Sequence, residues 1–245
     1  MASARLCCLA LVVLVCGACQ KLGLVEQYEY DERVELALDG SAVVDINASV
    51  PALVALRGAR LDTDPEARFD RQVFRKLYEG AGIAVREVSA YRRHRRRFVH
   101  VRLDVANIAE LPRIAPLAWS HYRLDRFEQE FRFVQEVGPA AQVPIGDVGW
   151  TGGELVAFRV HLPSRITFHN APAFERGNIL SWQQTLRDRL AGTPLRMEAR
   201  METQSILYRT LWLFGGTFLA AMSVLALIIW WVSRKGRKSR AGLAL

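Results

Sequence analysis

Residues 28–46 read YEYDERVELALDGSAVVDI, and this stretch indicates the fold class. Apolar and polar positions alternate on both sides of an Asp-Gly pair. One face carries Tyr28, Tyr30, Val34 and Leu36 before the pair and Ala42, Val44 and Ile46 after it. Alternation of this kind is typical of half-buried strands, and Asp-Gly favours a tight turn. The stretch therefore predicts a β-hairpin with its turn at Asp39-Gly40.

Two helices are predicted after the hairpin. The first covers residues 52–56, because Ser49 is a good cap, Pro51 suits the first turn, and Gly58 ends the pattern. The second starts near Pro65. Its apolar residues fall at helical spacing before Gly80 and Gly82. They are Phe69, Val73, Phe74, Leu77 and Tyr78.

The rest of residues 19–205 alternates mostly as strands. We expect strands at 83–90, 98–103, 120–124, 130–137, 154–162, 165–168, 178–182 and 195–202, with short helices at 105–110 and 183–190. Hairpin-like strand pairs outnumber strand-helix-strand units. The predicted fold is α+β, with a mainly antiparallel sheet and a few short helices.

The densest charged feature is the run from Tyr91 to Arg97, which lies between two predicted strands. It holds Arg92, Arg93, Arg95, Arg96 and Arg97. Guanidinium groups match phosphate geometry, so a hairpin tip with five arginines is a candidate contact for lipid headgroups. The alternative is a solvated turn whose arginines pair with nearby carboxylates. Both interpretations stay open at this point.

Motifs for catalysis or metal binding do not emerge from the sequence. The five histidines form no pair at a recurrent metal-site spacing, and no G-x-S-x-G element occurs. We therefore expect no catalytic residues, no metal and no cofactor. A non-enzymatic protein is predicted, and an envelope hydrolase is the less favoured alternative.

The second half of the domain contains three short motifs that together resemble a known pattern. They are Glu154-Leu-Val-Ala-Phe-Arg-Val-His-Leu-Pro163, Arg165-Ile-Thr-Phe-His-Asn170 and Gly177-Asn178-Ile-Leu-Ser-Trp182. They look like the closing strands of the LppM family of bacterial membrane lipoproteins. The resemblance implies a small α+β domain that binds membrane glycolipids such as phosphatidylinositol mannosides. Asn170, Asn178 and Trp182 are its motif residues, and their alternative role is structural, as turn formers and a core aromatic.

The N-terminus has the order of an export signal, with Arg5, an apolar run from Leu6 to Val15, and then small residues. Cys16-Gly17-Ala18-Cys19 resembles a bacterial lipobox. We expect residues 1–18 to be a signal peptide and Cys19 to carry a lipid. Plain secretory cleavage and an uncleaved anchor are the alternatives.

At the other end, residues 211–232 contain no charge and are long enough, at about 33 Å, to cross a bilayer. Five Lys or Arg residues follow Val232, whereas only Arg209 lies close before Leu211. This asymmetry predicts a transmembrane helix at 206–232 and a basic cytoplasmic tail at 233–245. Residues 19–205 would then lie outside the cytoplasmic membrane.

The charge and the cysteine content of the domain bear on its partners and on its stabilisation. The formal charge is +8, but without Arg5 and the five basic residues of the tail, 27 basic residues face 25 acidic ones. A nucleic-acid partner is therefore not expected. All four cysteines lie within residues 7–19, so the domain has no internal disulfide.

The favoured function is a membrane-anchored extracytoplasmic domain that binds lipid, glycolipid or another envelope component. The alternative is an assembly factor without a small ligand, whose transmembrane helix pairs with an envelope protein. Gly215, Gly216, Ala220 and Ala221 would allow such a close helix contact.

Overall fold

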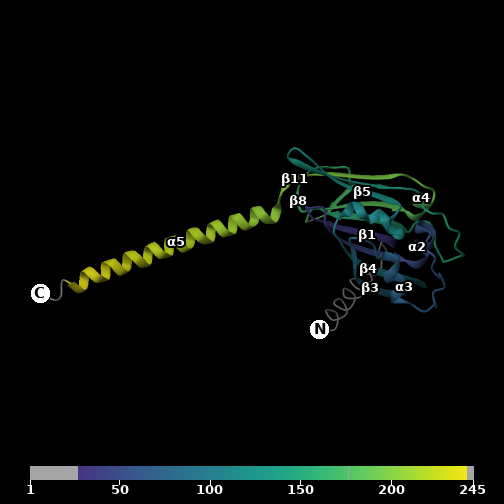
Figure 1. Ribbon diagram of the computed structural model, residues 1–245, viewed down its shortest axis with the longest axis horizontal. Coiled ribbons are helices and arrows are strands. Elements are labelled where there is room, and N and C mark those ends of the chain that lie inside the picture. The colour runs from purple at the N-terminus through teal and green to yellow at the C-terminus, as the bar shows by residue number, and fades with distance from the viewer. Residues whose placement is uncertain (1–26, 176, 242–245) are drawn as a thin grey trace, which may run out of the picture.

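The computed structural model describes residues 27–175 and 177–241, and within them two β-sheets pack against each other with short helices at their edges (Figure 1). The larger sheet has seven strands in the order β3-β4-β2-β1-β7-β10-β9, and the smaller has four in the order β5-β6-β11-β8. The strands of the larger sheet are β1 (Tyr28–Leu36), β2 (Ala42–Ser49), β3 (Ile83–Arg93), β4 (Arg96–Val105), β7 (Leu155–His161), β9 (Ala173–Glu175) and β10 (Ile179–Thr185). Those of the smaller sheet are β5 (Ser120–Phe127), β6 (Glu130–Val137), β8 (Ser164–His169) and β11 (Leu195–Ser205).

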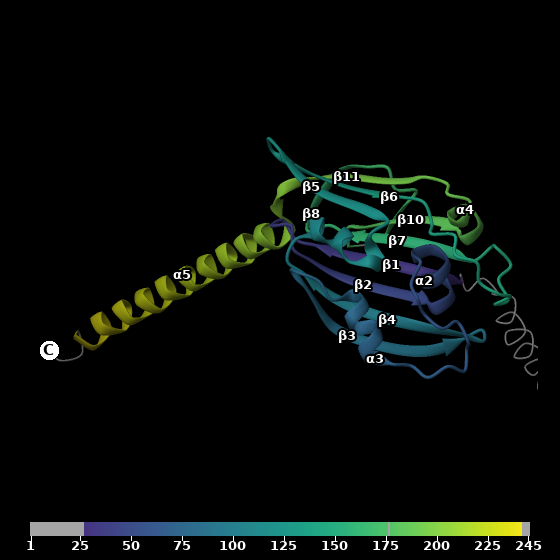
Figure 2. The ribbon, with the colours of Figure 1, turned by 45° about the vertical axis from the view of Figure 1, so that its right-hand side comes forward.

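The helices are short except for the last one. They are α2 (Val50–Arg57), α3 (Arg71–Tyr78), the 3-10 turns η2 (Ile108–Arg113) and η3 (Ala115–Leu117), α4 (Leu186–Leu190) and α5 (Ile206–Ala241). Figure 2 shows α2 and α3 beside the larger sheet and α5 extending away from the domain. The predicted α+β class, with mainly antiparallel pairing, is confirmed.

The prediction of a single sheet was wrong, because the strands form two separate sheets. The β1–β7 pair is also parallel, with Asp31 opposite Ala157 and Val34 opposite Val160. This pair joins segments more than 120 residues apart, and the chain between them builds β2 to β6 first. Local alternation does not predict such a pairing, because it carries no information on which distant strand will be the neighbour.

Local signals placed several elements well. Gly40 has a φ of 87° in the β1–β2 turn, and Ser49 Oγ accepts a hydrogen bond of 3.1 Å from the Ala52 amide at the start of α2. Gly58 ends that helix with a φ of 68°, a left-handed conformation that glycine adopts without a Cβ penalty. These turns and caps depend on residues close in sequence, which is why they could be predicted.

Three predicted helix positions need correction. The helix expected at 105–110 is the 3-10 helix η2 at Ile108–Arg113, because β4 extends to Val105. α3 begins at Arg71 and not near Pro65, because the Asp70 carboxylate accepts hydrogen bonds from the Gln72 and Val73 amides and acts as the cap. α4 is limited to residues 186–190, since residues 183–185 extend β10. The strand β9 was not predicted.

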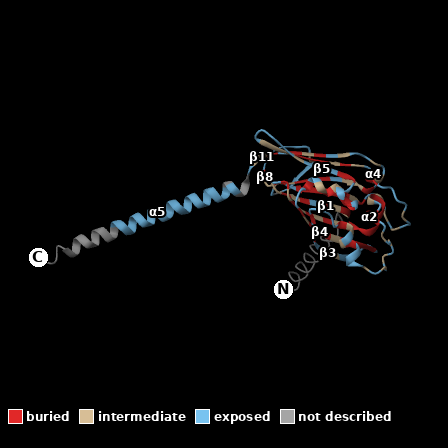
Figure 3. Cartoon of the chain, in the orientation of Figure 1, coloured by how far each residue is buried: buried red, intermediate tan, exposed pale blue. Residues whose placement is uncertain are grey.

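Figure 3 shows that the buried residues lie mostly on the strands of the two sheets, and most of these residues are apolar. Tyr30 of β1 meets Trp119 edge to face at 5.4 Å between ring centroids, and Phe158 of β7 lies 5.9 Å from Tyr30. Phe133 and Met197 of the smaller sheet are also fully buried. The domain thus has one core, to which both sheets contribute.

The strand pairings define two opposite ends of the domain. Tyr28 lies beside Leu155, and the β3–β4 hairpin projects at this end, which we call the hairpin end. At the other end Leu36 lies beside Ala42. Ser205 lies there too, where β11 continues into α5, and we call this the α5 end. The chain therefore enters β1 at the hairpin end and leaves at the α5 end.

The segment Thr210–Trp231 of α5 is 22 residues long, with a mean hydropathy of 2.1, and none of its most apolar window is buried against the domain. Figure 3 shows it as an exposed helix. By length and composition it is suited to cross a membrane. A helix packed in a soluble core would bury such a surface.

Candidate ligand cleft at the hairpin end

The turn of the β3–β4 hairpin consists of His94 and Arg95, with φ values of 48° and 58°. A two-residue hairpin turn with positive φ at both positions usually contains Asn or Gly. Side-chain-bearing residues are uncommon in this region, and backbone strain of this kind concentrates at functional sites. The tip thus keeps large polar side chains in a conformation that smaller turn residues adopt more easily.

The five arginines of the hairpin divide into two groups. Arg92, Arg93 and Arg95 are exposed, whereas the exposed fractions of Arg96 and Arg97 are only 4% and 7%. From the sequence, all five arginines were predicted to form one exposed cluster. The structure shows that this prediction is wrong for Arg96 and Arg97, which are buried. Successive side chains of β4 point to opposite faces, and other segments cover both faces at this point.

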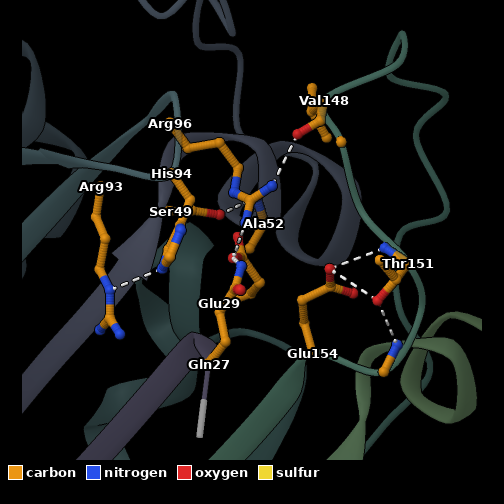
Figure 4. Close-up of polar contacts among 12 residues, drawn as sticks. Gln27, Glu29, Ser49, Ala52, Arg93, His94, Arg96, Val148, Thr151 and Glu154 are labelled. Atoms are coloured by element: carbon orange, nitrogen blue, oxygen red, sulfur yellow. Dashed lines mark hydrogen bonds and ion pairs between the residues drawn. The ribbon is translucent and has the colours of Figure 1, made fainter. Parts of the chain in front are cut away.

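Arg96 is held by a buried ion pair. Its Nη2 lies 3.0 Å from Glu29 Oε1, and its Nη1 donates a hydrogen bond of 2.8 Å to the Val148 carbonyl (Figure 4). Gln27 Nε2 also donates to Glu29 Oε1, at 3.0 Å. Arg96 Nε and Glu29 Oε2 are buried and have no hydrogen-bond partner among the described residues. Buried polar atoms in this state are candidates for contacts with a ligand or ordered water.

The neighbouring arginines have other partners. Arg97 donates to the carbonyl of Asp62. Arg92 forms an exposed ion pair of 3.0 Å with Glu66, and Arg93 Nε lies 3.1 Å from His94 Nε2. Pairing with a carboxylate was the alternative expected from the sequence, and it applies to Arg92 and Arg96.

A cleft of about 800 Å³ opens beside the turn. His94, Arg95 and Arg96 line one side, Gln27 lies at its base, and the loop of residues 147–154 forms the other side. The volume is within the range of small-molecule sites. Eight of the thirteen described residues that line it carry polar or charged side chains, so the cleft offers partners for a polar ligand.

Glu154 shapes the loop wall of the cleft. Its carboxylate accepts hydrogen bonds of 2.8 Å from the Thr151 and Gly152 amides (Figure 4). Burial raises the pKa of Glu154, but these backbone hydrogen bonds outweigh it and hold the pKa below its usual value. Gly152 has a φ of 85°, and a Cβ there would lie 2.9 Å from Arg187 Nη2. The Glu154 carboxylate thus holds the loop through these hydrogen bonds, and its lowered pKa keeps it ionised at neutral pH.

Asn170, Asn178 and Trp182 do not line this cleft. Trp182 Nε1 donates a hydrogen bond of 3.1 Å to Asn170 Oδ1, and that oxygen also accepts 2.9 Å from the Glu198 amide of β11. Asn178 has a φ of 60° in the turn before β10 and donates 2.8 Å to the Ser164 carbonyl. Two of the three residues therefore meet and connect the two sheets, and the third shapes a turn.

A buried polar cluster between the sheets was missed by the sequence analysis. The exposed fraction of Glu32 is 1%, and its carboxylate accepts hydrogen bonds from Tyr30, Tyr122 and Gln135 at 2.6–2.8 Å. Burial raises the pKa of Glu32, and these hydrogen bonds oppose the rise. The signal was present, because Glu32 occupies an inward position of β1 between Tyr30 and Val34.

Other predicted features lie outside the cleft or outside the described residues. Cys19 and the signal segment belong to residues 1–26, which the structure does not describe. His100 lies 3.3 Å from Asp45 on the surface of the larger sheet. Within residues 27–175 and 177–241, no group of three or more His, Asp or Glu residues is placed to hold a metal ion.

Comparisons with known proteins give little beyond the fold. No protein-family model matches the chain, and no curated protein matches it significantly. Among solved structures it is similar to the NMR structure of the folded domain of LppM from Mycobacterium tuberculosis. The TM-score is 0.41 at 16% sequence identity, over 74% of this chain and 94% of the other. This is a weak resemblance in fold and assigns the chain to no family.

Proposed function

We propose that this protein is a membrane-anchored extracytoplasmic domain that binds a phosphate-bearing, hydroxyl-rich headgroup, such as that of an envelope glycolipid, in the cleft at the hairpin end. The observation that carries the proposal is the placement of Arg95 and Arg96 at this cleft. One guanidinium is exposed at the turn and the other is held in place by Glu29. The protein supplies no catalytic group in this proposal, and binding is its activity.

The polar groups of the cleft match such a ligand. Arginine binds phosphate through two parallel hydrogen bonds, and a guanidinium held by packing loses little conformational entropy when it does so. Arg96 Nε still has donor capacity. Glu154 and Asp147, both at the cleft, provide acceptors for hydroxyl groups. A ligand with phosphate and hydroxyl groups would use both kinds of partner.

The location follows from α5 and its flanks. The basic residues after Val232 support a cytoplasmic C-terminal tail and a domain outside the membrane. Cys19 lies eight residues before Gln27, so a lipid at Cys19 would keep the cleft within about 29 Å of the bilayer even with the linker fully extended. With α5 at the opposite end, the domain would lie along the membrane, attached at both ends.

A second candidate function, assembly with another membrane protein, is favoured by a different observation. The core between the sheets consists mainly of packed apolar side chains, and Gly215, Gly216, Ala220 and Ala221 of α5 are all exposed. Small residues allow two transmembrane helices to approach closely. The partner in this case would be the helix of an envelope protein.

Lipid extraction and mass spectrometry of the purified full chain test the binding proposal. The wild type should retain an anionic glycolipid, and the Arg93→Ser/Arg95→Ser variant should lose most of it. Arg33→Ser/Arg123→Ser is the matched control, because it removes two exposed arginines outside the cleft. Equal lipid content in all three proteins would contradict the proposal.

Topology is tested separately by adding protease to intact spheroplasts. The domain should be digested and the tail after Val232 protected. Protection of the domain with loss of the tail would overturn the proposed orientation.

A further inference from the structure

The β5–β6 hairpin lies at the α5 end of the domain. The register of β6 and β11 places Glu130 beside Glu202, and β11 ends three residues later, at Ser205, where α5 follows. Figures 1 and 2 both show this hairpin projecting past the sheets on the side where α5 begins. The tip of the hairpin is therefore the part of the smaller sheet that extends furthest on this side.

An exposed aromatic side chain occupies the tip. The exposed fraction of Phe127 is 56%, and with Arg132 and Arg200 it lines a hollow of about 220 Å³. On the other side of β11, Phe168 is 45% exposed, with the Arg200 guanidinium 5.2 Å from its ring. The strand pairings put Phe127, Arg132, Arg200 and Phe168 on one face of the smaller sheet.

The distance to the apolar span of α5 is short. From Glu202 to Ser205 the strand rises about 10 Å, and from Ser205 to Thr210 the helix rises about 8 Å. The headgroup layers add about 10–15 Å in total to a hydrocarbon core of about 30 Å. Glu202, beside the tip, is therefore at most about 18 Å from the start of the span, and one headgroup layer is about 5–8 Å thick. The tip reaches this layer when the domain is inclined toward the membrane on the side of the hairpin.

Three arginines of this face are paired with carboxylates. Arg132 lies 2.8 Å from Glu198 and Arg200 lies 3.7 Å from the same residue. Arg165 lies 3.6 Å from Glu202. The face consequently offers aromatic rings among balanced charges. Its contact with a bilayer would depend on the rings and not on attraction to anionic lipids.

We propose that the β5–β6 tip, with Phe127 and the adjoining Phe168, inserts into the headgroup layer of the membrane that α5 spans. The inference rests on the membrane-spanning role of α5 in the proposed function. Aromatic side chains prefer the headgroup level of a bilayer. The contact would fix the smaller sheet against the membrane and limit rotation of the domain about the start of α5.

The experiment measures the depth of nitroxide labels on the full chain in nanodiscs of phosphatidylcholine. Single cysteines replace Phe127, Leu219 or Val73 in a background with Cys7, Cys8 and Cys16 changed to Ala and Cys19 to Ser. Leu219 reports the middle of the span, and Val73, 48% exposed on α3, reports bulk water. The label at 127 should collide several-fold less with a water-soluble nickel complex than the label at 73, equally at low and high salt.

The outcomes separate the two proposals. If the label at 219 is in hydrocarbon while the label at 127 is as accessible as that at 73, the hairpin contact is wrong and the anchor stands. If the label at 219 is also accessible to nickel, α5 does not span the bilayer and both proposals fall.

A second measurement avoids replacing the ring by the label. A label at Gln129, in the turn of the same hairpin, should move toward water in Phe127→Ser/Phe168→Ser and stay in place in Phe174→Ser. Phe174 is a matched control, because it is 57% exposed but belongs to β9 of the larger sheet. An unchanged position in the double variant would overturn the inference.

Discussion

Tyr122 of β5 donates a hydrogen bond of 2.6 Å to the carboxylate of Glu32 on β1, and this contact joins the two sheets through a fully buried acid. Tyr30 and Gln135 complete the set of donors to the same carboxylate. Arg57 lies nearby, with its guanidinium 3.8 Å from the Trp119 ring centroid, and burial lowers the pKa of Arg57 to about 10. The core therefore contains a polar centre whose geometry depends on both sheets.

Removal of one donor should destabilise the domain. Tyr122→Phe leaves the Glu32 carboxylate with one hydrogen bond fewer, and we expect the free energy of unfolding to fall by about 1–3 kcal/mol. Glu32→Ala leaves Tyr30, Tyr122 and Gln135 without their acceptor, so the free energy of unfolding should fall further. Chemical denaturation of the full chain in detergent, followed by near-ultraviolet circular dichroism, measures both. Glu87→Gln, on the exposed surface of β3, is the control and should stay within about 0.5 kcal/mol.

The stability should depend on pH through Glu32. Burial raises its pKa in the folded state above the ordinary value of 4.5, so the folded protein binds this proton more tightly than the unfolded chain. The resulting contribution to stability is present below pH 4.5 and is lost as the pH rises through the folded-state pKa.

Glu32→Gln cannot titrate, so it isolates this effect from Glu154, whose lowered pKa acts in the opposite direction. The free energy of unfolding of the wild type, relative to Glu32→Gln, should decline as the pH rises from about 4.5 toward neutrality. Denaturation curves at several pH values test this. A difference between the two proteins that does not change with pH would contradict it.

The hairpin arginines should separate into structural and surface residues. Arg96→Met leaves Glu29 buried without its charge partner, and the loss of stability should be about 3–5 kcal/mol. Arg95→Asn keeps a residue that tolerates positive φ and should stay within about 0.5 kcal/mol. Thermal and chemical unfolding of the two variants check the contrast. Equal stability would mean that the buried ion pair does not form.

Asn170 should be needed for the connection between the sheets. Asn170→Ala removes the acceptor for both Trp182 Nε1 and the Glu198 amide, and we expect a loss of about 1–3 kcal/mol. The hydrogen exchange of the Glu198 amide should accelerate as well. Gln129→Ala, in the exposed β5–β6 turn, should change neither quantity.

The attachment of a lipid to Cys19 remains a prediction from the sequence. Metabolic labelling with a fatty-acid analogue should mark the wild type and leave Cys19→Ser unlabelled. Labelling that persists in the variant would show that the lipid, if present, is attached elsewhere.

Several features followed from the sequence alone because they depend on neighbouring residues. Asp39-Gly40 predicted the first turn, and Ser49 with Gly58 predicted the limits of α2 closely. The run of apolar residues from Leu211 to Val232 predicted a transmembrane helix, and the structure has a helix there that is long and apolar enough to cross a membrane. In each case the determining contacts or hydropathy lie within a few residues along the chain.

The tertiary structure decided the rest. The five arginines of residues 92–97 look alike in sequence, yet Arg96 and Arg97 are buried because Glu29, Val148 and Asp62, all distant in sequence, supply their partners. Glu32 occupies an inward position in the alternation of β1, but only the packing of β5 and β6 over it supplies Tyr122 and Gln135 as its partners. The same holds for the division into two sheets, for the parallel β1–β7 pair and for the cleft. They depend on contacts between distant segments, whose formation is governed by packing of the whole core and not by local alternation.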